Sequence, residues 1–126
     1  MAVAHHSRHV TWLEVGRLEL MRSAGAAYEA LEADGFSLPV IGLEMRYRAP
    51  ARSGDIIEIE TSMQRSSPAR LAFTYRLTRS TDGVLLATGR SEHAAVDRAL
   101  RPVRLPGRLL SILETARSYP VAEGPC

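Results

Sequence analysis

The chain has 126 residues, a formal net charge of +2, and hydrophobic side chains at 45% of its positions. This length allows one domain with a buried core and is too short for two. The charge is too small and the arginines too scattered to predict a nucleic-acid-binding protein. No apolar run reaches the roughly 18 residues that span a bilayer, and the lone cysteine, Cys126, excludes an intramolecular disulfide. We therefore expect a cytoplasmic protein without membrane insertion.

The amino-terminal region predicts a helix over 8–23 that directly follows two adjacent histidines, His5 and His6. Ser7 is favoured as its N-cap, although Thr11 with Glu14 also fits a capping box that would start the helix four residues later. A helical period of about 100° per residue gathers an apolar arc made of Val10, Leu13, Leu20, Met21 and Ala24.

Arg17 falls in the middle of this apolar arc, and Glu14 lies one turn before it. The i,i+3 spacing lets the two side chains meet. A charge that faces the core needs a partner, because an unpaired buried charge costs several kcal/mol. We therefore expect a structural ion pair between Glu14 and Arg17.

The remainder of the chain predicts a short helix over 26–33 closed by Gly35, then four strands. Alternating apolar residues indicate strands over 39–48, around 57–60, over 71–78 and over 84–96, separated by turns at 50–55, 66–69 and 82–83. A last helix is expected over 107–117, followed by an end that frays. One long helix before a four-stranded antiparallel meander is an α+β layout. Such a sheet leaves an edge strand that a second copy would cover, so we expect a homodimer.

Few residues carry an obvious chemical signal. The sequence has no phosphate-binding glycine loop, CxxC, HExxH or GxSxG motif. His5 and His9 have the i,i+4 spacing of a metal pair but lack a third ligand, so no metal site is expected. His6 is the better candidate, because the free N–H groups at a helix start stabilise a developing oxyanion.

Three segments, AVAHHSRHVTWLEVGRLELM, PARSGD and SEHAAVD, resemble acyl-CoA thioesterases of the 4-hydroxybenzoyl-CoA thioesterase type. The resemblance extends from Met1 to about Leu110. It implies that residues 1–126 form a single domain with the hotdog fold, an antiparallel sheet wrapped around one long helix, with the first strand of the family missing. It also implies hydrolysis of an acyl-CoA or acyl-carrier-protein thioester in a pocket at the interface of a homodimer or homotetramer. Coenzyme A then enters as part of the substrate, and no separate cofactor is expected.

The resemblance assigns roles to individual residues. His6 and His5 are the expected catalytic residues: the backbone amide of His6 holds the oxyanion, and the ring of either histidine orients water. The family's catalytic aspartate falls two residues before Met1, so we expect the chain as given to bind acyl-CoA and hydrolyse it slowly. Pocket residues are expected at Phe36, Leu38, Pro39, Ile41 and Leu43.

Arg65 and Arg70 flank a serine-rich turn that aligns with a basic turn used by relatives of this family to bind the phosphates of coenzyme A. Arginine suits phosphate because its guanidinium presents a fixed fork of donors. Arg98 and Arg101 are weaker candidates of the same kind. Two alternatives stay open: the turn is merely solvated, or the chain is a non-catalytic hotdog protein that binds acyl-CoA or serves in an assembly.

Overall fold

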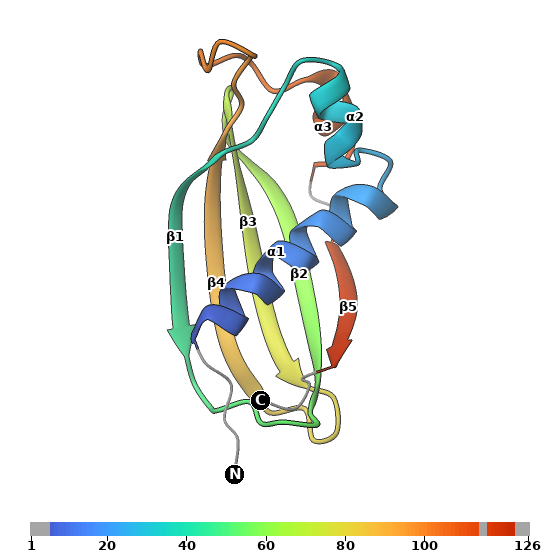
Figure 1. Cartoon of the computed structure of the whole chain (residues 1–126), viewed down its shortest axis with the longest axis vertical. Helices are drawn as coiled ribbons and strands as arrows, with labels where there is room; N and C mark the ends of the chain where they lie inside the picture. Colours follow the sequence, from blue (N-terminus) through green and yellow to red (C-terminus); the bar gives the residue numbers. More distant parts are fainter. Residues whose placement is uncertain (1–5, 114–115, 123–126) are drawn as a thin grey trace.

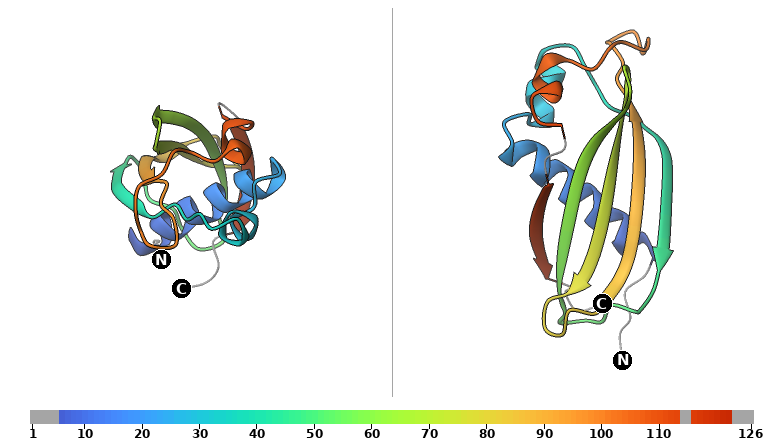
Figure 2. Two further views of the ribbon diagram at one scale, coloured as in Figure 1. Left: turned by 90° about the horizontal axis from the view of Figure 1, so that it is seen from above. Right: turned by 180° about the vertical axis from the view of Figure 1, so that it is seen from behind.

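The computed structural model describes residues 6–113 and 116–122. A five-stranded antiparallel sheet curves around one long helix, as Figure 1 and Figure 2 show. In chain order the elements are α1 (His6–Ser23), α2 (Tyr28–Ala33), β1 (Val40–Tyr47), β2 (Ile56–Ser67), β3 (Arg70–Arg79), β4 (Leu85–Ala94), α3 (Gly107–Leu110) and β5 (Ala116–Ala122). The predicted α+β arrangement, a sheet wrapped around one helix, is confirmed. None of the described helices is long and apolar enough to cross a membrane.

The strand order is β1-β4-β3-β2-β5, which corrects the predicted meander at its first strand. Strands β2, β3 and β4 follow one another as expected, but β1 pairs with β4. The connection 48–55 passes along one end of the sheet from β1 to β2 (Figure 1). Because this connection is longer than a hairpin loop, the two strands that it joins need not be neighbours.

The second correction concerns the end of the chain. Helix α3 stops at Leu110 instead of continuing to residue 117, and the expected frayed end contains strand β5. The apolar residues of 107–117 are spaced as in a helix, which is why the sequence predicts one. Pro120 argues against a strand in this region because proline lacks an N–H group. Proline is tolerated on an edge strand, and β5 is one, since it pairs only with β2 among the described strands.

Helix α1 packs on the concave face of the sheet through a stripe that differs in phase from the predicted arc. Leu13, Leu20 and Met21 are buried as predicted, but Val10 is 41% exposed, and Trp12 is buried in its place. Gly16 lies at the centre of the stripe, where an added Cβ would stand 2.7 Å from Ile59 Cγ2 of β2. The helix begins at His6, two residues before the predicted start, so the alternative start at Thr11 is wrong.

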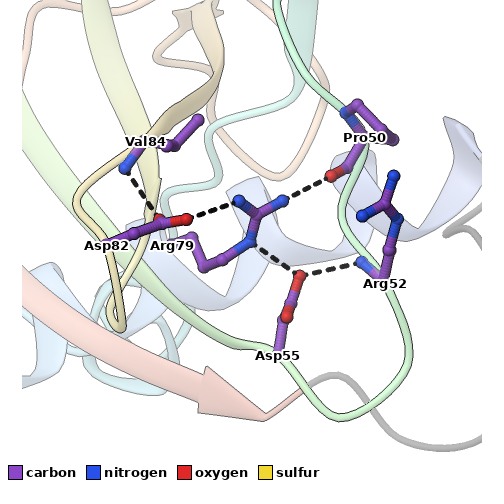
Figure 3. Close-up of polar contacts among 6 residues, drawn as sticks. All are labelled: Pro50, Arg52, Asp55, Arg79, Asp82 and Val84. Carbon is purple, nitrogen blue, oxygen red and sulfur yellow. Dashed lines mark hydrogen bonds and ion pairs between the residues drawn. The ribbon is translucent and has the colours of Figure 1, made fainter.

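Arg79 fastens the loops at the end of the sheet where α1 begins (Figure 3). Its Nε donates to Asp55 at 3.1 Å, one Nη donates to Asp82 at 2.9 Å, and the other donates to the carbonyl of Pro50 at 2.9 Å. A backbone hydrogen bond from Arg52 is the main cause that lowers the pKa of Asp55. The crossover from β1 to β2 is therefore tied to the β3–β4 hairpin.

The close approach at Gly16 predicts that Gly16→Ala destabilises the protein. Alanine favours a helix by about 1 kcal/mol over glycine, but its Cβ would lie 2.6 Å from Thr61 Oγ1 and 2.7 Å from Ile59 Cγ2. Overpacking of this kind costs about 1–3 kcal/mol. Urea unfolding should therefore show a lower free energy of unfolding for Gly16→Ala. Gly107→Ala is the matched control, because nothing lies within 4 Å of its added Cβ. A Gly16→Ala protein more stable than wild type would contradict the close approach.

Candidate active site

The first turn of α1 lies beside the last residues of β1 (Figure 1). His6 is the first residue of this 18-residue helix, two residues before the predicted start, so its amide lies at the helix start. The first N–H groups of a helix have no intrahelical acceptor and carry a partial positive charge. His5 and the ring of His6 lie outside the described part of the structure, so their catalytic role stays a prediction.

His9 anchors this first part of the helix to β1. Its ring centroid lies 4.8 Å from that of Trp12 and 4.9 Å from that of Tyr47, the last residue of β1, in a nearly perpendicular contact. His9 is buried between these rings. Within residues 6–113 and 116–122, no three histidine, cysteine or acidic residues form a cluster able to hold a metal ion.

The expected ion pair between Glu14 and Arg17 does not form among the described residues. Arg17 instead donates from Nη1 to the hydroxyl of Tyr75 at 3.4 Å, while Glu14 is exposed. The i,i+3 ion pair of this helix joins Glu19 to Arg22 on the surface. The buried stripe is centred one residue earlier than predicted, which turns Arg17 to its margin and Glu14 toward solvent.

Arg17 begins a polar row that runs beneath α1. The Tyr75 hydroxyl lies 2.7 Å from Ser91 Oγ, and Ser91 Oγ lies 2.8 Å from His93 Nε2. His93 Nδ1 lies 2.9 Å from the carbonyl oxygen of Leu38. We call these groups, from Arg17 to the Leu38 carbonyl, the polar row. Tyr75, Ser91 and His93 are all buried.

The carbonyl of Leu38 fixes the direction of every hydrogen bond in the polar row. Because a carbonyl only accepts, His93 must donate from Nδ1, and a neutral ring then accepts at Nε2. Ser91 therefore donates to His93, and Tyr75 donates to Ser91. The oxygen of Tyr75 is left to accept from Arg17. Burial lowers the pKa of His93, which keeps the ring neutral, and burial also raises the pKa of Tyr75.

Sequence reasoning missed the polar row, although part of its signal is visible. Ser91 and His93 are two residues apart on a strand and so share a face. What the sequence does not give is the register, which sets Ser91 opposite Phe73 and Gly89 opposite Tyr75. Only that register brings the Tyr75 hydroxyl onto Ser91.

A pocket of about 330 Å³ opens between the second half of α1 and the segment before β1. Two of its lining residues are charged, Glu14 and Arg17; the others are Leu18, Met21, Tyr28, Leu38, Pro39 and Val40. The pocket therefore has largely apolar walls, with one end of the polar row at Arg17 and the other at Leu38.

The predicted pocket residues are only partly brought together. Leu38 and Pro39 line the pocket, as expected. Phe36 packs against the core instead, and Ile41 and Leu43 are about half exposed on β1. Strand β1 lies at an edge of the sheet and has no neighbour on its outer side within the described residues.

Arg65 and Arg70 lie at the opposite end of the sheet from the start of α1, at the β2–β3 hairpin. Arg70 pairs with Ala94, whereas Tyr47 pairs with Ala87. At about 3.3 Å per residue along a strand, these two levels are about 23 Å apart. Among the described residues, Arg65 Nε donates to the carbonyl of Ser67, at 3.3 Å. Both arginines are exposed, and neither has a carboxylate partner among the described residues.

The neutral state of His93 predicts that stability falls below about pH 6.5, the ordinary pKa of histidine. The unfolded chain then binds a proton that the folded protein excludes, because burial lowers the folded pKa. The stabilisation is complete above the unfolded pKa and is lost as the pH falls toward the lowered folded value. Urea unfolding at about pH 5.5 and 7.5 should give a smaller pH dependence for His93→Gln than for wild type. Equal dependence in both proteins would contradict the assignment.

Comparison with known proteins identifies similar chains. A family model described as the thioesterase-like superfamily matches residues 1–113. The chain is 30% identical over 83 residues to the acyl-CoA thioester hydrolase YbgC of Escherichia coli, a match that covers 66% of this chain and 62% of the relative. Across the curated relatives the chain spans between 57% and 75% of their length.

Solved structures show the same fold. A hypothetical protein, TT1821 of Thermus thermophilus, is 38% identical with a TM-score of 0.81, and the match covers 90% of this chain and 88% of that one. The DHNA-CoA thioesterase of Staphylococcus aureus is 27% identical with a TM-score of 0.77, over 83% of this chain and 70% of that one. These neighbours confirm the hotdog fold that the sequence predicts.

Proposed function

The chain belongs to the thioesterase-like superfamily, and from this premise we propose that it hydrolyses acyl-CoA thioesters at a site shared by two copies of the chain. The observation that carries the proposal is the separation of the site into two halves. The helix start at His6 and the arginines Arg65 and Arg70 lie at opposite ends of the sheet. A single copy does not bring these groups together.

The open edge of the sheet supports pairing with a second copy. Most side chains of β1 are exposed, and its large apolar ones include Val40, Ile41, Leu43 and Tyr47. On α1, Leu18 is exposed and lines the pocket together with Val40, and Val10 is exposed as well. An exposed apolar edge strand is a template for another strand, and a contiguous apolar patch marks an interaction site.

Antiparallel pairing of β1 with β1 of a second copy completes the site. A two-fold axis between the strands sets the end of one sheet that carries the β2–β3 hairpin beside the end of the other sheet at which α1 begins. The helix start of one copy then lies next to the pocket of its partner and on the side of the partner's arginine-bearing hairpin. Each two-fold pair holds two such composite sites.

The chemistry of the composite site follows from its charges. The N–H groups at the start of α1 bind the thioester carbonyl oxygen and stabilise the negative charge that it gains when water attacks the carbonyl carbon. Collapse of the tetrahedral intermediate breaks the C–S bond, the coenzyme A thiolate leaves and takes up a proton, and the carboxylic acid is released. Arg65 and Arg70 bind phosphates of coenzyme A. The rings of His5 and His6 orient the water.

Replacement of His6 separates the role of its amide from that of its ring. His6→Pro removes the N–H group and fits the first turn of a helix, where proline is favoured. Loss of one oxyanion donor costs about 10²–10³ in kcat. We expect this loss for His6→Pro and a much smaller one for His6→Ala, which keeps the amide. Release of the coenzyme A thiol from benzoyl-CoA and butyryl-CoA measures both rates.

The outcome also separates the hydrolase from a non-catalytic acyl-CoA-binding protein. Each variant is compared with the same chain that carries His6, so the two rates differ only through residue 6. Equal rates for His6→Pro and wild type would refute the oxyanion role of the amide. Acyl-CoA binding without thiol release above the uncatalysed rate would overturn the proposed hydrolysis and favour the binding protein.

A further inference from the structure

We propose that Arg17 selects acyl groups that carry a carboxylate, and that the polar row holds Arg17 in place for this task. The inference rests on the proposed function, because it assigns the acyl end of that substrate. Its basis is a charge that has no counter-ion among the described residues, on the wall of a largely apolar pocket. Arg17 is half-buried there, and among the described residues it donates a hydrogen bond to a neutral hydroxyl, that of Tyr75, at 3.4 Å.

A carboxylate fits the N–H donors of Arg17 that have no acceptor among the described residues. A guanidinium has five N–H donors in a planar fork, of which the bond to Tyr75 takes one. The fork fits the two oxygens of a carboxylate, and hydrogen bonds between charged partners are about twice as strong as neutral ones. Apolar walls strengthen the attraction, because they lower the local dielectric constant. An unsubstituted alkyl or aryl group would leave the charge of Arg17 without this partner.

The polar row gives Arg17 a fixed position. Because Tyr75 donates its proton to Ser91, its oxygen can only accept from Arg17. The other end of the row is bound to the carbonyl of Leu38, which lines the same pocket. The row therefore connects the two walls of the pocket, α1 on one side and the segment before β1 on the other. Tyr75 is in this sense a positioning residue for Arg17.

Glu14 supplies an internal control because it lines the same pocket with the opposite charge. It is exposed, and no ion pair joins it to Arg17 among the described residues. Its negative charge opposes a bound carboxylate, and solvent screens the repulsion only in part. Removal of this charge by Glu14→Gln should therefore raise the preference for a carboxylate, whereas removal of the charge of Arg17 should abolish it.

The test uses pairs of thioesters that match in shape and differ in charge. These are suberoyl-CoA with octanoyl-CoA, and 4-carboxybenzoyl-CoA with 4-methylbenzoyl-CoA. We expect wild type to prefer the carboxylate member of at least one pair by about tenfold or more in kcat/KM. Arg17→Gln should lose this preference, Arg17→Lys should keep part of it, and Tyr75→Phe should reduce it. Glu14→Gln should increase it.

Equilibrium binding of the same four thioesters to wild type and each variant makes the test independent of turnover. Equal preference in wild type and Arg17→Gln, by rate or by binding, would overturn the inference. Hydrolysis of all four thioesters without a charge preference refutes the role of Arg17 and leaves the proposed function intact. A binding preference without hydrolysis supports the role of Arg17 and refutes the proposed function. If Arg17→Gln fails to fold, two results still test the inference. These are the preference of wild type for the carboxylate thioesters and the increase of this preference in Glu14→Gln.

Discussion

The close contact between α1 and β2 at Gly16 sets the rotation of the helix, and the rest of the structure depends on that rotation. With Gly16 against Ile59 and Thr61, His9 faces the end of β1 and Arg17 reaches the hydroxyl of Tyr75. A bulkier residue at this position would force the helix away from the sheet or turn it. The contact at Gly16 therefore determines the positions of the helix start, the polar row and the wall of the pocket.

The same rotation leaves an open apolar surface along β1 and the adjacent face of α1. A monomer gains nothing from exposed apolar side chains on an edge strand, and such an edge promotes uncontrolled pairing. In the pair that we propose, a second copy covers this edge, which then becomes the seam along which two incomplete sites are joined. The site then assembles only when the two copies associate. The residues that bury the seam also bring the helix start of one copy to the pocket of the other.

Much of this fold was predictable from local patterns, and the failures have physical causes. Alternation located β2, β3 and β4, and the resemblance identified the fold. The pairing of β1 with β4 and the strand around Pro120 were missed, because long connections and edge strands leave weak local signals. In the site, the pair of Glu14 with Arg17 was wrong because Gly16, which carries no apolar side chain, is the residue that faces the sheet. The polar row depends on a register that alternation alone does not encode.

Subunit complementation tests the composite site most directly. His6→Pro damages one half of the site, and the double variant Arg65→Ala/Arg70→Ala damages the other half, so each is defective when it pairs with itself. In a mixed pair, one of the two composite sites combines the intact helix start of one copy with the intact arginines of the other. After subunit exchange at equal concentrations, we predict that acyl-CoA hydrolysis recovers to about a quarter of the wild-type rate, because half of the pairs are mixed and each holds one intact site. A mixture no faster than the mean of the two separate variants would contradict the shared site.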